Sequence, residues 1–305
     1  MEITDLAIGV PAAIAAAAAF GLAGYLQHGA ARKTTDRRAL RPGLLLDLLR
    51  FKQFQWSIVL SGAGFGLQVL ALRFAPLSVV QPLLVTGVLF YLGFAALARH
   101  HRIDNGLVLG ALMALVGLSV FLLVARPSEG TAQFHGSAAL PLGLALVVVV
   151  LVCLAIASRL SDEVRALPFA VATAVFYGVT AALIRSLLAT VSWSTLFTHW
   201  QLYAVIVVAP AGFLLNQNAF QVGSLGAVAV ATITVGDPIV AIGAGVAWLG
   251  ESLGGGPAST VIEIFALMLM AVGVAVLTRR SQHIADQIRE RAEVAAPPKE
   301  AESCG

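Results

Sequence analysis

Long runs of apolar residues fill most of the chain, and short polar segments separate them. A helix of about 20 apolar residues crosses a hydrocarbon core about 30 Å thick with its backbone groups hydrogen-bonded internally. Runs of about this length predict nine transmembrane helices, at 5–26, 54–74, 77–98, 106–125, 138–157, 167–188, 201–220, 225–249 and 261–278. We therefore expect an all-α integral membrane protein.

The composition agrees with this fold class. Hydrophobic residues make up 59% and charged residues 11% of the 305 positions, and the mean hydropathy is +0.90. Soluble proteins are typically about 45 to 50% apolar and about 25% charged. Soluble enzymes and nucleic-acid-binding proteins are therefore poor matches, and we expect a multi-pass protein of the cytoplasmic membrane whose main partner is the lipid bilayer.

Basic residues mark one side of the predicted helices. Most of the 19 Lys and Arg fall in alternate connections, namely the loop 27–53, the loops that contain Arg99 and Arg159, and the tail 279–305. Because cytoplasmic loops retain positive charge, this pattern predicts an outside N-terminus and an inside C-terminus, which requires an odd number of helices. The loop 27–53 holds seven basic residues and is expected to lie along anionic headgroups.

Two internal matches predict a repeat. The turn 72–78, between the second and third helices, resembles the turn 220–226, which lies 148 positions later between the seventh and eighth. Phe20-Gly21 in the first helix resembles Tyr177-Gly178 in the sixth, 157 positions later. Together these matches predict that helices 1 to 4 recur as helices 6 to 9.

The predicted organisation is a first repeat at 1–134, a connecting helix at 138–157 and a second repeat at 164–278, followed by the tail. A single connecting helix makes the second repeat enter the membrane from the opposite side, so the repeats are inverted. Secondary transporters use this architecture for alternating access, with the substrate site near the bilayer midplane.

Short motifs along most of the chain resemble those of the drug/metabolite transporter (EamA-like) superfamily. In the second half these are Asp237-Pro238, Gly250-Glu251 and the last-helix segment 273–277. The first half is similar to the NIPA-type magnesium transporters within that superfamily. The residues that carry this similarity are Trp56, Arg73 to Leu77, Gln81-Pro82-Leu83 and Val124 to Pro127. The resemblance implies transport of a small solute, with Mg²⁺ as one candidate.

Asp237 is the most informative single residue, because it lies at the middle of the eighth predicted helix. An ionisable group at that depth costs about 2.5 to 3.5 kcal/mol on insertion scales and usually faces a cavity or a partner. Pro238 removes an intrahelical hydrogen bond beside it. We predict a proton or cation site here, coupled to solute movement. The alternative is a neutral Asp that hydrogen-bonds a neighbouring helix.

Other polar side chains in the predicted helices suit a polar, uncharged or zwitterionic solute. Besides Asp237 and Pro238, the predicted pathway residues are Gln81, Pro82, Gln68, Asn216, Asn218, Thr234 and Tyr177. Hydrogen bonding between helices, worth about 0.6 kcal/mol per bond, is the alternative role for each. Arg185 and Glu263 fall at similar depth near the outer helix ends and are candidates for an outer gate, with snorkelling to the interface as the alternative.

The function favoured by these patterns is secondary transport, with no enzymatic activity, catalytic residue, metal cluster or cofactor. A phosphate-binding loop and a His-Glu-x-x-His motif are both absent from the sequence. Mg²⁺ transport ranks second, because Mg²⁺ prefers several oxygen ligands including carboxylates and the helices offer one deep acid. A non-transporting membrane scaffold ranks third. The solute, the coupling ion and the direction of transport stay open, as does a homodimer.

Overall fold

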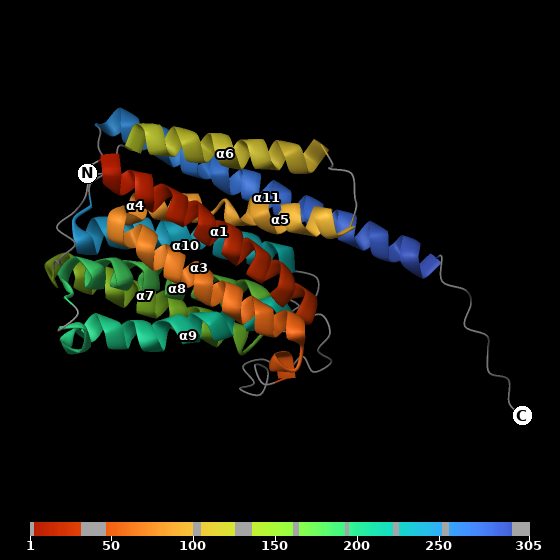
Figure 1. Ribbon diagram of the computed structural model, residues 1–305, viewed down its shortest axis with the longest axis horizontal. Helices are drawn as coiled ribbons and strands as arrows, with labels where there is room; N and C mark the ends of the chain where they lie inside the picture. The colour runs from red at the N-terminus through yellow and green to blue at the C-terminus, as the bar shows by residue number, and fades with distance from the viewer. Residues whose placement is uncertain are drawn as a thin grey trace, which may run out of the picture.

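The chain folds into a bundle of long helices that lie side by side (Figure 1). The computed structural model describes residues 3–31, 47–99, 105–125, 136–160, 165–192, 195–221, 226–251 and 256–294, and no strand occurs within them. The long elements are α1 (Ile3–Ala31), α3 (Lys52–Phe74), α4 (Leu77–Leu84), α5 (Gly87–Arg99), α6 (Asn105–Ala125), α7 (Gly136–Ala157), α8 (Ala166–Thr190), α9 (Trp200–Gln221), α10 (Gly226–Leu249) and α11 (Pro257–Val294). A short 3₁₀ helix, Leu196–Thr198, precedes α9.

Seven helices in the described part of the chain are long and apolar enough to cross a membrane, namely α1, α3 and α7 to α11. Two shorter apolar segments, Leu77–Tyr91 and Val108–Phe121, coincide with the third and fourth predicted spans. The expected all-α, multi-pass membrane protein is therefore confirmed, and the total of nine crossings stays a prediction. Most of the basic loop, at 32–46, and the end of the tail, at 295–305, lie outside the described residues.

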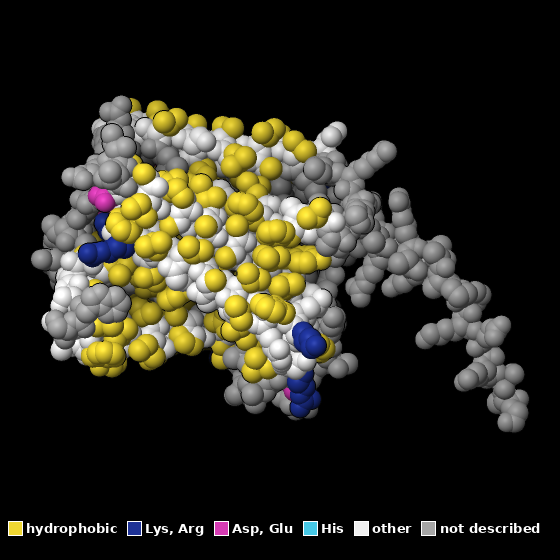
Figure 2. All heavy atoms as spheres, viewed as in Figure 1, with side chains coloured by type: hydrophobic (Ala, Val, Ile, Leu, Met, Phe, Trp, Pro, Cys, Tyr) yellow, Lys and Arg dark blue, Asp and Glu magenta, His cyan; other side chains and the backbone are white. Residues whose placement is uncertain are grey.

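The outer surface of the bundle is apolar over the length of the helices. The face seen in Figure 2 is covered mainly by hydrophobic side chains, and its Lys and Arg side chains lie towards the two ends. On α7, large apolar residues such as Leu144, Val148 and Leu151 are exposed. Only 6% of the apolar segment Leu140–Ala157 of this helix is buried within the protein. A surface of this kind is stable in lipid and not in water.

The helices pack through close approaches at small residues. The main pairs are α6 with α11, α1 with α3 and α5, and α8 with α9 and α10. A Cβ on Gly117 would lie 2.6 Å from Ala266 O and Met270 N, and a Cβ on Gly273 would lie 2.5 Å from Ala114 N. Residues later in α6 thus meet residues earlier in α11, so these two helices run antiparallel with their backbones in contact.

The third predicted span, 77–98, is broken into α4 and α5 by a turn at Val85 and Thr86. Pro82 has no N–H to donate to the carbonyl one turn earlier, and Thr86 Oγ1 bonds back to Leu83 O (2.7 Å). Gly87 then begins α5 against α1, since a Cβ there would lie 3.0 Å from Ala17 O. The last helix also differs from its predicted end at 278, because α11 continues to Val294 through part of the expected tail.

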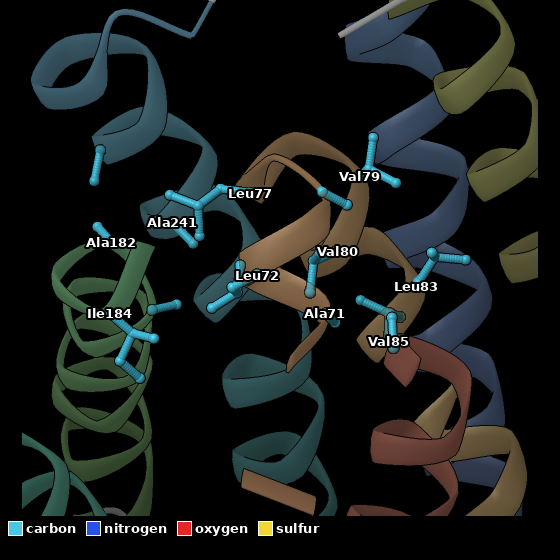
Figure 3. Packing of buried hydrophobic residues seen from close by; sticks show 14 of the residues in the cluster. Ala71, Leu72, Leu77, Val79, Val80, Leu83, Val85, Ala182, Ile184 and Ala241 are labelled. Atoms are coloured by element: carbon cyan, nitrogen blue, oxygen red, sulfur yellow. The ribbon is translucent and has the colours of Figure 1, made fainter. Parts of the chain in front are cut away.

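One hydrophobic core joins the two halves of the chain. It contains Leu72 at the end of α3 and Leu77 and Val80 of α4, together with Ala182 of α8 and Ala241 of α10. Figure 3 shows these side chains converging where α4 lies among α8, α10 and α11. The start of α4 is therefore packed against helices from the second half of the sequence.

Candidate functional site

Three of the predicted pathway residues meet in the structure. Tyr177 of α8 lies close enough to the Asn216 side chain of α9 and to Asp237 of α10 for both to act on its hydroxyl electrostatically. Three helices that form separate predicted spans thus bring their polar groups together. We call Asp237, Tyr177 and Asn216 the Asp237 cluster.

Glycines explain why the three helices approach closely at this level. A Cβ on Gly178, next to Tyr177, would lie 2.8 Å from the backbone nitrogen of Ala241 in α10. A Cβ on Gly212, one turn before Asn216, would lie 3.1 Å from the Tyr177 ring. The absence of these side chains lets α8 pack directly on α10 and lets the Tyr177 ring lie against α9.

The oxygens of the Asp237 cluster have unused hydrogen-bonding capacity. Asp237 Oδ1 and Asn216 Oδ1 are buried and have no hydrogen-bond partner among the described residues. Pro238, which follows Asp237, has no backbone N–H and so removes one intrahelical hydrogen bond from α10 beside the cluster. Oxygen acceptors gathered inside a membrane protein favour a proton, a cation or a hydrogen-bond donor as their partner.

Gln81 is a second buried polar group without a partner, and it lies in α4. Its side chain is 1% exposed, and neither amide atom has a hydrogen-bond partner among the described residues. Beside it, Pro82 and Thr86 line a small cavity with Ala114 of α6 and Met270 of α11, which has room for about one water molecule. α4 also packs against α10, the helix that carries Asp237.

The remaining predicted residues have other surroundings. Gln68 is partly exposed on α3. Asn218 donates to Leu214 O of its own helix (2.8 Å). Arg185 Nη1 donates to Leu72 O at the end of α3 (2.7 Å). The contact of Arg185 with the end of α3 was not predicted from the sequence.

Glu263, the other predicted gate residue, lies in α11. Its side chain is buried, and its Oε1 has no hydrogen-bond partner among the described residues. The described side chains of Glu263 and Arg185 do not form an ion pair with each other. The pairing of Arg185 with Glu263 as a gate therefore stays a prediction without support from the geometry.

Two polar connections between the halves were missed by the sequence reasoning. Gln217 Nε2 of α9 donates to Gln27 Oε1 of α1 (3.1 Å), and Gln27 Nε2 donates to Ser61 Oγ of α3 (3.1 Å). At the opposite end of the bundle, the carboxylate of Glu251 accepts hydrogen bonds from Leu77 N (2.9 Å) and Ser78 N (3.2 Å) of α4. The only sequence feature that pointed to the contact of Glu251 with α4 was the Gly250-Glu251 pair in the family resemblance.

Comparison with known proteins gives one relative. The chain is 25% identical over 272 residues to an uncharacterized protein of Corynebacterium glutamicum, and the match spans 88% of this chain and 94% of that protein. No protein-family model matches the chain, and no solved structure matches it.

Proposed function

We propose that the protein is a secondary transporter that moves a small solute across the cytoplasmic membrane by alternating access, coupled to a proton or cation at Asp237. The observation that carries this proposal is the Asp237 cluster, in which three helices contribute polar groups with unused acceptors inside an apolar bundle. Intramembrane ionisable groups with this setting commonly mark substrate or ion pathways. Membership of the drug/metabolite transporter superfamily is part of the proposal and is supported by the motif resemblance.

The contact between α6 and α11 supports two inverted repeats. Gly117 and Gly273 are 156 positions apart, and so are Ala114 and Met270. Gly117 approaches Met270, and Gly273 approaches Ala114, so each contact is repeated with the two helices exchanged. Reciprocal contacts of this kind are the mark of a twofold axis.

The direction of that axis favours opposite topologies. α6 and α11 are antiparallel, so an axis that exchanges them is perpendicular to the helices and lies in the plane of the membrane. The same offset, within one residue, relates Gly21 to Gly178. Gly21 packs on α5 and Gly178 on α10, and the segment α4–α5 and α10 are the third helices of their halves. These relations support nine helices, with repeats at 1–134 and 164–278 and α7 as the connection. The basic residues in alternate connections favour an outside N-terminus.

The offset also relates Gln81-Pro82 to Asp237-Pro238. Each pair carries buried side-chain polar atoms without a hydrogen-bond partner, followed by a proline inside a helix. An amide in one half and a carboxylate in the other favour a small polar solute with a cationic or hydrogen-bond-donating group. Mg²⁺ prefers more oxygen ligands than one carboxylate and neutral groups supply, unless it keeps several waters.

The proposal is tested by flux measurements on the purified protein in liposomes. A thermal-shift screen against amino acids, amines, nucleosides and MgCl₂ identifies solutes that stabilise the protein through binding. Uptake of each such solute is then followed in liposomes that contain a pH-sensitive dye. We expect at least one organic solute to enter and to change the internal pH, and we expect Asp237→Asn to lower that uptake by about 100-fold, as loss of a charged contact is worth a few factors of ten.

Three outcomes would count against this assignment. Solute uptake with an unchanged pH response in the Asp237→Asn variant would remove Asp237 as the coupling group. An Asp237-dependent influx of Mg²⁺, read with a Mg²⁺-sensitive dye, would replace the organic solute with Mg²⁺. A protein that binds and moves none of the panel while folded would favour the membrane scaffold.

A further inference from the structure

A buried carboxylate from the second half of the chain caps the first helical turn of α4. The Glu251 side chain accepts from Leu77 N at Oε1 (2.9 Å) and from Ser78 N and Ser78 Oγ at Oε2 (3.2 and 3.0 Å). Glu251 as a residue is 3% exposed. The first amides of a helix have no partner within the helix, and a carboxylate there also interacts favourably with the helix dipole. This contact joins residues that lie 174 positions apart.

Local backbone geometry directs Glu251 onto α4. Gly250 has φ of 65°, a left-handed conformation that other residues rarely adopt, and it turns the chain back at the end of α10. Glu251 N then donates to Gly245 O (3.0 Å). A Cβ on Gly245 would lie 2.8 Å from Glu251 Oε2, so this glycine leaves room for the carboxylate. Gly245, Gly250 and Glu251 form one socket that faces the start of α4.

Two arginines connect the same two halves at this end of the bundle. Arg185 Nη1, in the last two turns of α8, donates to Leu72 O in the last turn of α3 (2.7 Å). Arg73 Nη1, in the last turn of α3, donates to Leu188 O in the last turn of α8. Each guanidinium binds a carbonyl that the end of a helix leaves without an intrahelical donor. The C-terminal ends of α3 and α8 are therefore joined by two reciprocal hydrogen bonds.

A break in the helix separates α4 from α5. It is eight residues long, contains Pro82, and is joined to α5 by the turn at Val85 and Thr86. We propose that Glu251 is the latch of a gate at this end of the bundle: when it releases Leu77 and Ser78, α4 swings about the Val85–Thr86 turn and opens a path towards the Asp237 cluster. This inference rests on the proposed function, and it gives Glu251 a positioning role.

The latch acts at one end of the bundle. It joins the start of α4 to the end of α10, which is the outer end in the expected orientation. The carboxylate therefore favours closure of the outer side, and its release would open that side.

Labelling of a cysteine beneath the latch tests this inference. Thr86 lies nine residues from the start of α4, about 13 Å deeper along the helix at 1.5 Å per residue. Thr86→Cys is placed in a background where Cys153 and Cys304 are replaced by Ala, and a membrane-impermeant thiol reagent is added to right-side-out membrane vesicles. We expect Glu251→Gln to raise the labelling rate by about 10-fold or more, because it removes charge-assisted hydrogen bonds and turns an amide N–H₂ towards the α4 donors.

Thr190→Val is the control. It removes a hydrogen-bonding group at the same end of the bundle, where Thr190 Oγ1 donates to Ser186 O of its own helix, α8 (3.2 Å). It should leave the Thr86→Cys labelling rate within about twofold of the parent, since a substitution away from such a contact usually changes stability by about 0.5 kcal/mol or less. If Glu251→Gln does not fold, Ser78→Ala replaces it and should raise the rate by about threefold through loss of one hydrogen bond. A folded Glu251 or Ser78 variant with an unchanged rate, or an equal increase with Thr190→Val, would overturn the latch.

The readout separates this inference from the proposed function. Cysteine labelling needs no solute, so a faster rate in Glu251→Gln supports the latch even if no solute is transported. Conversely, solute flux that depends on Asp237 while Thr86→Cys labelling ignores Glu251 would leave the transporter in place without this latch.

Discussion

At the scale of single residues, the structure adds a spatial arrangement to side chains that the sequence singled out by depth and polarity. Asp237 was predicted to be functional because of its depth in the bilayer, and Tyr177 and Asn216 were predicted as pathway residues from their polarity alone. The structure brings these three side chains together from three helices. Gln68 was also predicted as a pathway residue, and it is partly exposed on α3. Packing sets the rotation of each helix about its axis, and the polarity of a side chain does not report that rotation.

Tyr177 offers a sharp test at this scale. Tyr177→Phe removes only the hydroxyl that interacts with Asn216 and Asp237, and the ring that packs on Gly212 stays. We expect solute uptake into liposomes to fall by about 10-fold, the effect of one hydrogen bond of roughly 1.4 kcal/mol, with little change in thermal stability. The control is Thr180→Val one turn away, whose hydroxyl donates to Phe176 O of its own helix (2.7 Å). Uptake by Tyr177→Phe as fast as that by Thr180→Val would exclude the hydroxyl from the site.

At the scale of elements, glycines decide which helices pair and how closely. Gly117 and Gly273 hold α6 against α11, and Gly178 holds α8 against α10. In lipid, such contacts stabilise a helix pair through van der Waals packing, because apolar side chains gain little by leaving one apolar medium for another. The predicted spans agree with most helices to within a few residues, since bilayer thickness sets their length. The break between α4 and α5 was not predicted as two helices, because a proline in a membrane helix is often tolerated without one.

The reciprocal glycines make a paired prediction. Gly117→Ala and Gly273→Ala should each lower the thermal midpoint of the detergent-solubilised protein by several degrees, since overpacking costs about 1 to 3 kcal/mol and 1 kcal/mol shifts the midpoint by roughly 2 to 4 °C. Gly62→Ala and Gly143→Ala are matched controls, because nothing lies within 4 Å of a Cβ at either position. They should leave the midpoint unchanged or slightly raised. A large loss in only one of Gly117→Ala and Gly273→Ala would contradict the twofold relation.

At the scale of the whole molecule, the sequence predicted the class of the fold better than its internal connections. Apolar run lengths were enough for an all-α membrane protein. The contact of Glu251 with Leu77 and Ser78 joins residues that are more than half of the chain apart, and no local sequence pattern indicates which helix end a buried acid will cap. The hydrogen bonds that link Gln217, Gln27 and Ser61 were not predictable from the sequence either. A glutamine beside a basic loop also suits the membrane interface, so its presence does not indicate a contact between helices.

The central claim is that the Asp237 cluster faces each side of the membrane in turn, and cysteine accessibility from both sides tests it most directly. Asn216→Cys, with Cys153 and Cys304 replaced by Ala, is exposed to an impermeant thiol reagent in right-side-out and in inside-out vesicles. Val148→Cys on the lipid-facing surface of α7 is the control and should react from neither side. We predict that Asn216→Cys reacts in both kinds of vesicle. Reaction in only one kind, or in neither, would contradict alternating access.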